Sequence, residues 1–171
     1  MKLQVKALCR LSALLVALSA LAACNQYDVR VNDRVVYTPD PLFSDYAASD
    51  PALQRCLDKA ISREKITSAA QLRALDCRGA GITELTGLQV FTGLRELLLA
   101  DNAVSDLSPL LPLSSLEILS LADNAVSDPR PLYELLSLRS LDLSGNTGLS
   151  CPPRQDLLRV VELTLPTHCA R

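Results

Sequence analysis

Hydrophobic positions recur along this chain with a period of 22 residues. Three columns of mostly leucine residues share the period, and each column has five members. The columns are Leu72, Leu94, Leu116, Leu138 and Val160; Leu75, Leu97, Leu119, Leu141 and Leu163; and Cys77, Leu99, Leu121, Leu143 and Leu165. Within each repeat, one residue separates the apolar positions of the second and third columns. This alternation is the pattern of a short strand with one buried side.

A strict period of this length that carries L-x-x-L-x-L is typical of a leucine-rich repeat. Four full repeats cover residues 72–93, 94–115, 116–137 and 138–159, and a truncated fifth covers 160–171. One repeat cannot bury its own apolar side, so the copies must stack and bring their strands into one parallel sheet. We therefore predict an α/β fold: a short leucine-rich repeat solenoid with a concave parallel sheet.

The turns between strands carry their own repeated residues. An asparagine follows three of the strands, at Asn102, Asn124 and Asn146. A buried asparagine amide can satisfy backbone groups of neighbouring turns, so we expect a structural ladder of side chains. The return arm carries a glycine or proline in one register, at Gly87, Pro109 and Pro131. Repeated proline disfavours a full helix, so the convex side is expected to be irregular or 3₁₀.

Residues 50–71 are predicted to form an N-terminal helical cap. Asp50 is a favourable helix cap, and Pro51 suits the first helical position. One face of this helix is apolar, with Leu53, Cys56, Leu57, Ala60 and Ile61 at helical spacing. A second short helix is expected to begin at Thr67 or Ser68 and to run to about Leu75.

Residues 24–49 have no repeat register. The segments 27–31 and 34–37 flank Asn32 and Asp33, which is compatible with a small hairpin. An extended tether is an equal alternative. Pro39 and Pro41 end any strand in this region.

The first 23 residues resemble a secretory signal, with Lys2, Lys6 and Arg10 before a short apolar stretch. This stretch ends in Leu21-Ala22-Ala23-Cys24, which resembles the lipobox of bacterial lipoproteins. The resemblance implies cleavage before Cys24 and acylation of that residue. Two or more acyl chains anchor a protein stably in a bilayer. Asn25 after the cysteine is compatible with an outer-membrane lipoprotein that faces the periplasm.

Four cysteines remain in the mature chain, and they allow three pairings. Cys56 and Cys77 both precede the first full repeat loop, whereas Cys151 and Cys169 both lie at the C-terminal end. We favour the disulfides Cys56–Cys77 and Cys151–Cys169, because each would staple an end of the solenoid where a stacking neighbour is missing. The oxidising envelope permits such bonds.

Charge and composition narrow the choice of partner. Without the three basic residues of the signal, the 17 basic residues of the chain fall to 14, against 19 acidic residues. This negative balance disfavours a phosphate-binding surface. The chain has no Trp and only two Phe and four Tyr, so stacking platforms for single-stranded nucleic acid are not expected.

Residues 102–110 resemble the 22-residue repeats of internalin-like and phosphatase-regulator-like leucine-rich proteins. Their sequence is Asn102-Ala103-Val104-Ser105-Asp106-Leu107-Ser108-Pro109-Leu110. The resemblance covers roughly residues 72–165. It implies the solenoid fold, and it leaves the partner open because members of such families bind different proteins.

The concave residues follow from the repeat register. Leu98 and Ile118 form an apolar centre, and polar residues surround it, as in many protein interfaces. We predict the partner-binding residues Glu96, Leu98, Ile118, Ser120, Arg139 and Asp142. The function predicted is non-enzymatic protein binding by a lipid-anchored monomer at the bacterial cell envelope. A structural envelope lipoprotein without a concave ligand is the alternative.

Catalytic and metal sites are not predicted. His168 is the one histidine and adjoins Cys169, which is not the arrangement of a catalytic triad. The acidic pairs Asp101 with Asp123 and Asp106 with Asp128 could hold Ca²⁺, but such residues more often cap turns. We therefore expect no cofactor, no bound metal and no enzymatic activity.

Overall fold

The structure is a computed structural model that describes residues 29–31, 34–37 and 40–169. The predicted signal, residues 1–23, and the predicted lipid attachment site Cys24 lie outside the described residues. The chain divides into two compact units after Pro41. In the first unit, β1 (Val29–Val31) and β2 (Arg34–Tyr37) pair antiparallel, which is the hairpin alternative for this segment.

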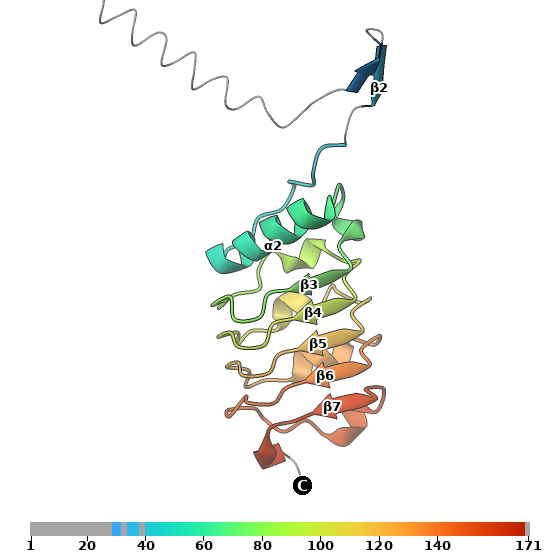
Figure 1. The fold of residues 1–171 in the computed structure, drawn as a ribbon. Helices are drawn as coiled ribbons and strands as arrows, with labels where there is room; N and C mark the ends of the chain where they lie inside the picture. The colour runs from blue at the N-terminus through green and yellow to red at the C-terminus, as the bar shows by residue number, and fades with distance from the viewer. Residues whose placement is uncertain (1–28, 32–33, 38–39, 170–171) are drawn as a thin grey trace, which may run out of the picture. The chain divides into compact units, whose positions relative to one another are not determined.

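The second unit is built on one parallel sheet whose five strands follow each other in chain order (Figure 1). The strands are β3 (Ala74–Asp76), β4 (Glu96–Leu98), β5 (Ile118–Ser120), β6 (Ser140–Asp142) and β7 (Glu162–Thr164). Residues 22 positions apart face each other across every pair, as Leu97 faces Leu119. The predicted leucine-rich repeat solenoid is therefore confirmed.

The three apolar columns form the core of this unit, together with residues from the turns. Leu97 and Leu99 are fully buried, and so are Val104 and Val126 from the following turns. The convex side is 3₁₀, as predicted, with η3 (Leu88–Val90), η4 (Ser108–Leu110), η5 (Arg130–Glu134) and η6 (Arg154–Leu157). Proline within η4 and η5 suits these short turns, because it needs no amide donor there.

The predicted asparagine ladder is also confirmed. The Asn124 amide nitrogen donates to the carbonyl of Leu99 in the preceding repeat at 2.8 Å, and its oxygen accepts from the Val104 amide at 2.9 Å. Asn102 and Asn146 make the same bonds in their own repeats. Each asparagine side chain therefore links adjacent turns of the stack, which the pairing of the strands does not connect.

Helix α2 (Pro51–Glu64) covers the N-terminal end of the repeats, as predicted. Its apolar face places Leu53 and Leu57, both fully buried, into the core. The second predicted helix is wrong, because only the short turn η2 (Ala69–Gln71) forms there. The chain must extend from Leu72 onward so that the Arg73 carbonyl can accept the amides of Arg95 and Glu96 in the sheet.

Asp50 ties this helix to the first repeat. One carboxylate oxygen accepts the amides of Ala52 at 2.7 Å and Leu53 at 3.2 Å, as a helix cap does. The other accepts the Thr83 amide at 2.7 Å and the Thr83 hydroxyl at 2.9 Å. Burial disfavours the charged carboxylate, but these hydrogen bonds from Thr83, Ala52 and Leu53 outweigh it and lower the pKa of Asp50.

Residues 42–49 belong with the repeats rather than with the preceding segment, so the boundary falls after Pro41 and not after Ser49. Phe43 and Tyr46 pack around Phe91, with ring centroids 6.0 and 5.6 Å from it. The chain also runs so close to Gly87 that a Cβ there would lie 2.6 Å from the Ala47 oxygen. Gly87 has φ of 112°, so both the space and the backbone require glycine.

Both predicted disulfides are present. Cys56 of α2 bonds Cys77 after β3, and Cys151 bonds Cys169 in the final turn η7 (Thr167–Cys169). The bonds span 21 and 18 residues, so each closes a local loop at one end of the stack. Within the described part of the chain, no helix is both long and apolar enough to cross a bilayer.

Candidate functional site

Two columns of side chains run across the concave face of the sheet. The strand register aligns Ala74, Glu96, Ile118, Ser140 and Glu162 in the first column, and Asp76, Leu98, Ser120, Asp142 and Thr164 in the second. Because side chains alternate along a strand, these ten residues face away from the core. We call this surface the concave face.

The apolar centre of the concave face consists of Leu98 and Ile118, which lie on adjacent strands and in different columns. Ile118 is 40% exposed, and Leu98 is half-buried. Glu96 and Ser140 flank Ile118, whereas Asp76 and Ser120 flank Leu98. An accessible apolar pair inside a polar surround therefore exists at the middle of the sheet.

The predicted site residues lie together, with one exception. Glu96, Leu98, Ile118, Ser120 and Asp142 occupy the two columns over three neighbouring strands. Arg139 precedes β6 and stands at the flank, where its backbone carbonyl accepts the amides of Val161 and Glu162. Its exposed side chain forms no ion pair with any described residue. Asp142 accepts the Ser144 amide at 2.9 Å, which fixes its carboxylate near the backbone.

Two ion pairs at the margin were not foreseen from the sequence. Two guanidinium nitrogens of Arg78 donate to the Asp76 carboxylate at 2.9 and 2.7 Å. Arg95 forms an ion pair with Glu117 at 2.7 Å. The hydrogen bond from the Arg78 side chain lowers the pKa of Asp76. These pairs neutralise charge beside the apolar centre, whereas Arg139 forms no ion pair with any described residue.

The acidic pairs that could have held Ca²⁺ act in the turns. Asp106 accepts the Ser108 amide at 2.9 Å. Asp128 accepts the Arg130 amide and the Arg130 guanidinium, whose side-chain hydrogen bond lowers the pKa of Asp128 to about 2. Asp101 and Asp123 are exposed and occupy left-handed positions at φ of 60° and 52°. Their conformations serve the turns, as Asp often does.

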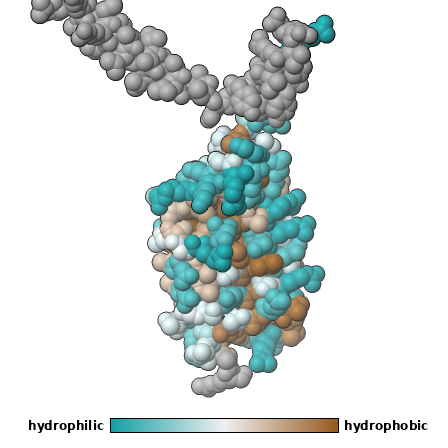
Figure 2. Space-filling model, in the orientation of Figure 1, coloured by the Kyte–Doolittle hydropathy of each residue, from teal (hydrophilic) through white to brown (hydrophobic). Residues whose placement is uncertain are grey.

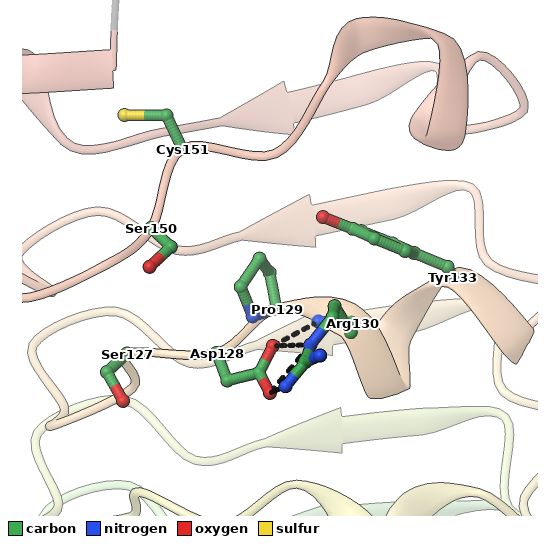
Figure 3. Close-up of a pocket in the computed structure, with 7 residues that line it drawn as sticks. All are labelled: Ser127, Asp128, Pro129, Arg130, Tyr133, Ser150 and Cys151. Atoms are coloured by element: carbon green, nitrogen blue, oxygen red, sulfur yellow. Dashed lines mark hydrogen bonds and ion pairs between the residues drawn. The ribbon is translucent and has the colours of Figure 1, made fainter.

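A small hollow lies away from the concave face, where the turn after β5 meets the turn after β6 (Figure 3). It measures about 290 Å³ and is lined by Ser127, Asp128, Pro129, Arg130, Tyr133, Ser150 and Cys151. The sequence analysis did not single out these residues as a group. The guanidinium of Arg130 is paired with both oxygens of Asp128. The hollow is a weaker candidate than the concave face.

One group of three potential metal ligands occurs among the described residues, at Cys151, His168 and Cys169, with ligand atoms within 4.8 Å of one another. The two sulfurs are joined in a disulfide and offer no thiolate. A ring nitrogen of His168 lies 3.0 Å from the Leu149 carbonyl. The arrangement therefore braces the last turn.

The chain resembles internalins in structure. It aligns with an internalin (inlF) from Listeria monocytogenes at a TM-score of 0.51 and 21% identity, over 68% of this chain and 43% of that one. It also aligns with an internalin C2 (inlC2) from the same organism at a TM-score of 0.42 and 22% identity, over 68% and 74% of the two chains. The chain thus spans less than half of the first internalin. No family model and no curated protein matches the chain. The first likeness confirms an internalin-like leucine-rich repeat fold.

Proposed function

We propose that this protein is a non-enzymatic binding module that holds a protein partner on its concave face. The observation that carries the proposal is the exposed apolar centre, Leu98 and Ile118, in the middle of two continuous columns of polar and small residues. Interfaces between proteins share this plan of an apolar core within a polar rim. A parallel sheet of stacked repeats also supplies a rigid, open surface of the kind that repeat proteins use for binding.

The charges around the centre indicate what the partner offers. Glu96 and Asp142 lie on the concave face, and Arg139 stands at its flank without an ion pair among the described residues. A partner that presents an apolar side chain flanked by a basic group and an acidic group would match this distribution. Such complementarity governs specificity and association rate more than affinity.

Replacement of the apolar centre tests the proposal. The Leu98→Arg, Ile118→Arg protein and the wild type would be cross-linked to envelope extracts, and the captured proteins identified. Substitution of Val90 and Leu111 by arginine is the matched control, because these residues are 41% and 44% exposed and lie on or beside convex turns. Loss of one partner from the concave variant alone supports the proposal. Equal recovery from all three proteins would refute it and favour the structural-lipoprotein alternative.

We further propose that a lipid on Cys24 anchors the module at the outer membrane, where it faces the periplasm. The support is the sequence Leu21-Ala22-Ala23-Cys24 after a basic and apolar leader. Cys24→Ser is expected to release the protein from the membrane fraction and to leave uncleaved precursor. Unchanged processing and unchanged membrane association would contradict the anchor while leaving the binding proposal intact.

A further inference from the structure

A third metal-binding side chain stands beside the C-terminal disulfide. His168 is the only histidine of the chain, and one of its ring nitrogens lies within 4.8 Å of the sulfurs of Cys151 and Cys169. The two sulfurs are neighbours because they are bonded, so the position of the imidazole beside both is the independent observation. Cysteine sulfurs and imidazole nitrogens are donors that zinc sites in proteins commonly combine. Three donors of a zinc site are therefore gathered at this disulfide.

The ring of His168 is held in place by the backbone. Its Nε2 lies 3.0 Å from the Leu149 carbonyl oxygen. A carbonyl oxygen can only accept, so Nε2 carries the hydrogen in this contact, and Nδ1 of the neutral ring keeps its lone pair. Histidines that bind a metal usually donate their other ring N–H to a carbonyl or carboxylate oxygen, which fixes the ring. The Leu149 carbonyl supplies such a partner to His168.

The C-terminal disulfide is more accessible than the N-terminal one. Cys151 and His168 are exposed and Cys169 is half-buried, whereas in the other disulfide Cys56 is half-buried and Cys77 is 3% exposed. Cys151 also lines the hollow of about 290 Å³ (Figure 3). Figure 2 shows mostly pale surface, of intermediate hydropathy, at the lower end of the stack, where the chain reaches η7. A thiol must reach a sulfur to reduce a disulfide, so a dithiol should open the C-terminal bond first.

We propose that this disulfide is the oxidised form of a zinc site, and that Cys151, His168 and Cys169 bind Zn²⁺ after a dithiol has reduced it. The dithiol donates two electrons and two protons: the S–S bond breaks, two thiols form, and the dithiol becomes a disulfide. Zn²⁺ then displaces the two thiol protons and bonds to both sulfurs and to Nδ1 of His168. A water molecule from the exposed side completes the four ligands. The proposal goes beyond binding on the concave face, and it limits the expectation of no bound metal to the oxidised protein.

The geometry allows this exchange with little movement of the backbone. Tetrahedral zinc holds each sulfur at about 2.3 Å, which sets the two sulfurs about 3.8 Å apart. The Cα atoms of Cys151 and Cys169 are 5.3 Å apart, and rotation of the two side chains can part the sulfurs by this amount. The ion would then join the turn after β6 to η7, as the disulfide does in the oxidised protein. The same connection would therefore persist in both oxidation states.

Metal binding by the full-length protein in detergent gives the first test. The protein is reduced with a phosphine, which supplies no competing thiol, and titrated with Zn²⁺, or with Co²⁺, whose visible absorption reports sulfur ligands and tetrahedral geometry. The reduced wild type is expected to bind one ion per chain at this site, and the oxidised wild type none. The Cys56→Ser, Cys77→Ser protein should bind the ion as the wild type does, whereas the Cys151→Ser, Cys169→Ser protein should not.

His168→Gln separates a metal ligand from a structural residue. Glutamine keeps a side-chain N–H that can donate to the Leu149 carbonyl, but it lacks the imidazole lone pair. The dissociation constant for Zn²⁺ should rise by about tenfold or more in this variant, while its oxidised form should unfold at the same temperature as the oxidised wild type. Because the disulfide closes the turn before reduction, the variant enters the titration folded.

Thiol labelling tests access. A limited amount of a dithiol, followed by alkylation and mass spectrometry, should label Cys151 and Cys169 before Cys56 and Cys77. Failure of the reduced protein to bind an ion, equal affinity in His168→Gln, or equal binding by the Cys151→Ser, Cys169→Ser protein would overturn the proposal. Earlier labelling of Cys56 and Cys77 would also overturn it, because the site could not then open selectively.

Discussion

The two ends of the solenoid are closed in different ways. At the N-terminal end, two fully buried leucines of α2 pack against the first repeat. The core residues beneath this helix are as buried as those in the middle of the stack. At the other end, the described residues supply a disulfide and a short turn, and Leu163 and Leu165 stay half-buried. A disulfide restrains the chain, but it covers little apolar surface. A helix that packs on the end of the stack does cover it.

Leucine truncation gives the largest expected difference between the ends. Leu57→Ala removes a fully buried side chain from α2 and is expected to lower the free energy of unfolding by about 3 to 4 kcal/mol. Leu165→Ala should lower it by about 1 to 2 kcal/mol, because part of that side chain already contacts water. Chemical denaturation followed by circular dichroism measures both. Equal losses would mean that the C-terminal end is covered in solution.

Removal of the disulfides separates chain restraint from burial. The two bonds span 21 and 18 residues, so their effect on the unfolded chain is nearly the same, about 3 kcal/mol each. The Cys56→Ala, Cys77→Ala protein should therefore lose about as much stability as the Cys151→Ala, Cys169→Ala protein. Thermal unfolding of the two variants beside the wild type makes the comparison.

A much smaller loss for the Cys151→Ala, Cys169→Ala protein would have a definite meaning. It would show that the last turn unfolds separately from the rest, so that its disulfide does not contribute to global stability. The two ends would then differ in how cooperatively they unfold with the rest of the unit, rather than in how much of their apolar surface is covered.

The repeat register explains why most of the fold could be predicted from sequence. Each turn buries the same positions, so a residue such as Leu119 has the same environment as its counterparts 22 positions away. The segment 42–49 has no such counterpart, and its attachment depends on contacts of Phe43 and Tyr46 with Phe91, distant in sequence. The second helix failed because sheet pairing of Arg73 overrides local helical preference.

The candidate site was predictable in part for the same reason. Alternation along the strands placed Leu98 and Ile118 on the concave face, but side-chain rotamers decide that Arg78 reaches Asp76 and Arg95 reaches Glu117. The partial exposure of Leu163 and Leu165 could not be seen in the sequence, because both residues continue their columns without any change of residue type. They lie in and directly after β7, the last strand that the structure describes.

Asp50→Asn tests the polar link at the N-terminal end. The variant is expected to lose about 2 kcal/mol at neutral pH, because the charged acceptor binds the amides of α2 and of the first repeat. The folded state lowers the pKa of Asp50 below its ordinary value of 3.8, so this stabilisation is present above that value and is lost as the pH falls through and below it.

The measurement is the free energy of unfolding of both proteins between pH 7 and pH 2. The gap between wild type and Asp50→Asn should close as the pH falls below about 4. Asp106→Asn is the control, because Asp106 also accepts a turn amide but is exposed and does not link two elements. A gap that stays constant with pH would show that the charge of Asp50 is not what stabilises the cap.

Arg159→Lys tests the corresponding polar link at the C-terminal end, with the smallest expected effect. Its guanidinium donates to the carbonyls of Leu132 and Leu135 at 2.8 and 3.0 Å, which ties the end of the fourth repeat to η5. Lysine keeps the charge but cannot reproduce the planar fork, so a loss of about 1 kcal/mol is expected. Amide hydrogen exchange should quicken around η5 and η6 and stay unchanged in α2, because the repeats contact only their neighbours. Faster exchange throughout the unit would instead show that both ends unfold together, and the contrast between them would then be one of exposure alone.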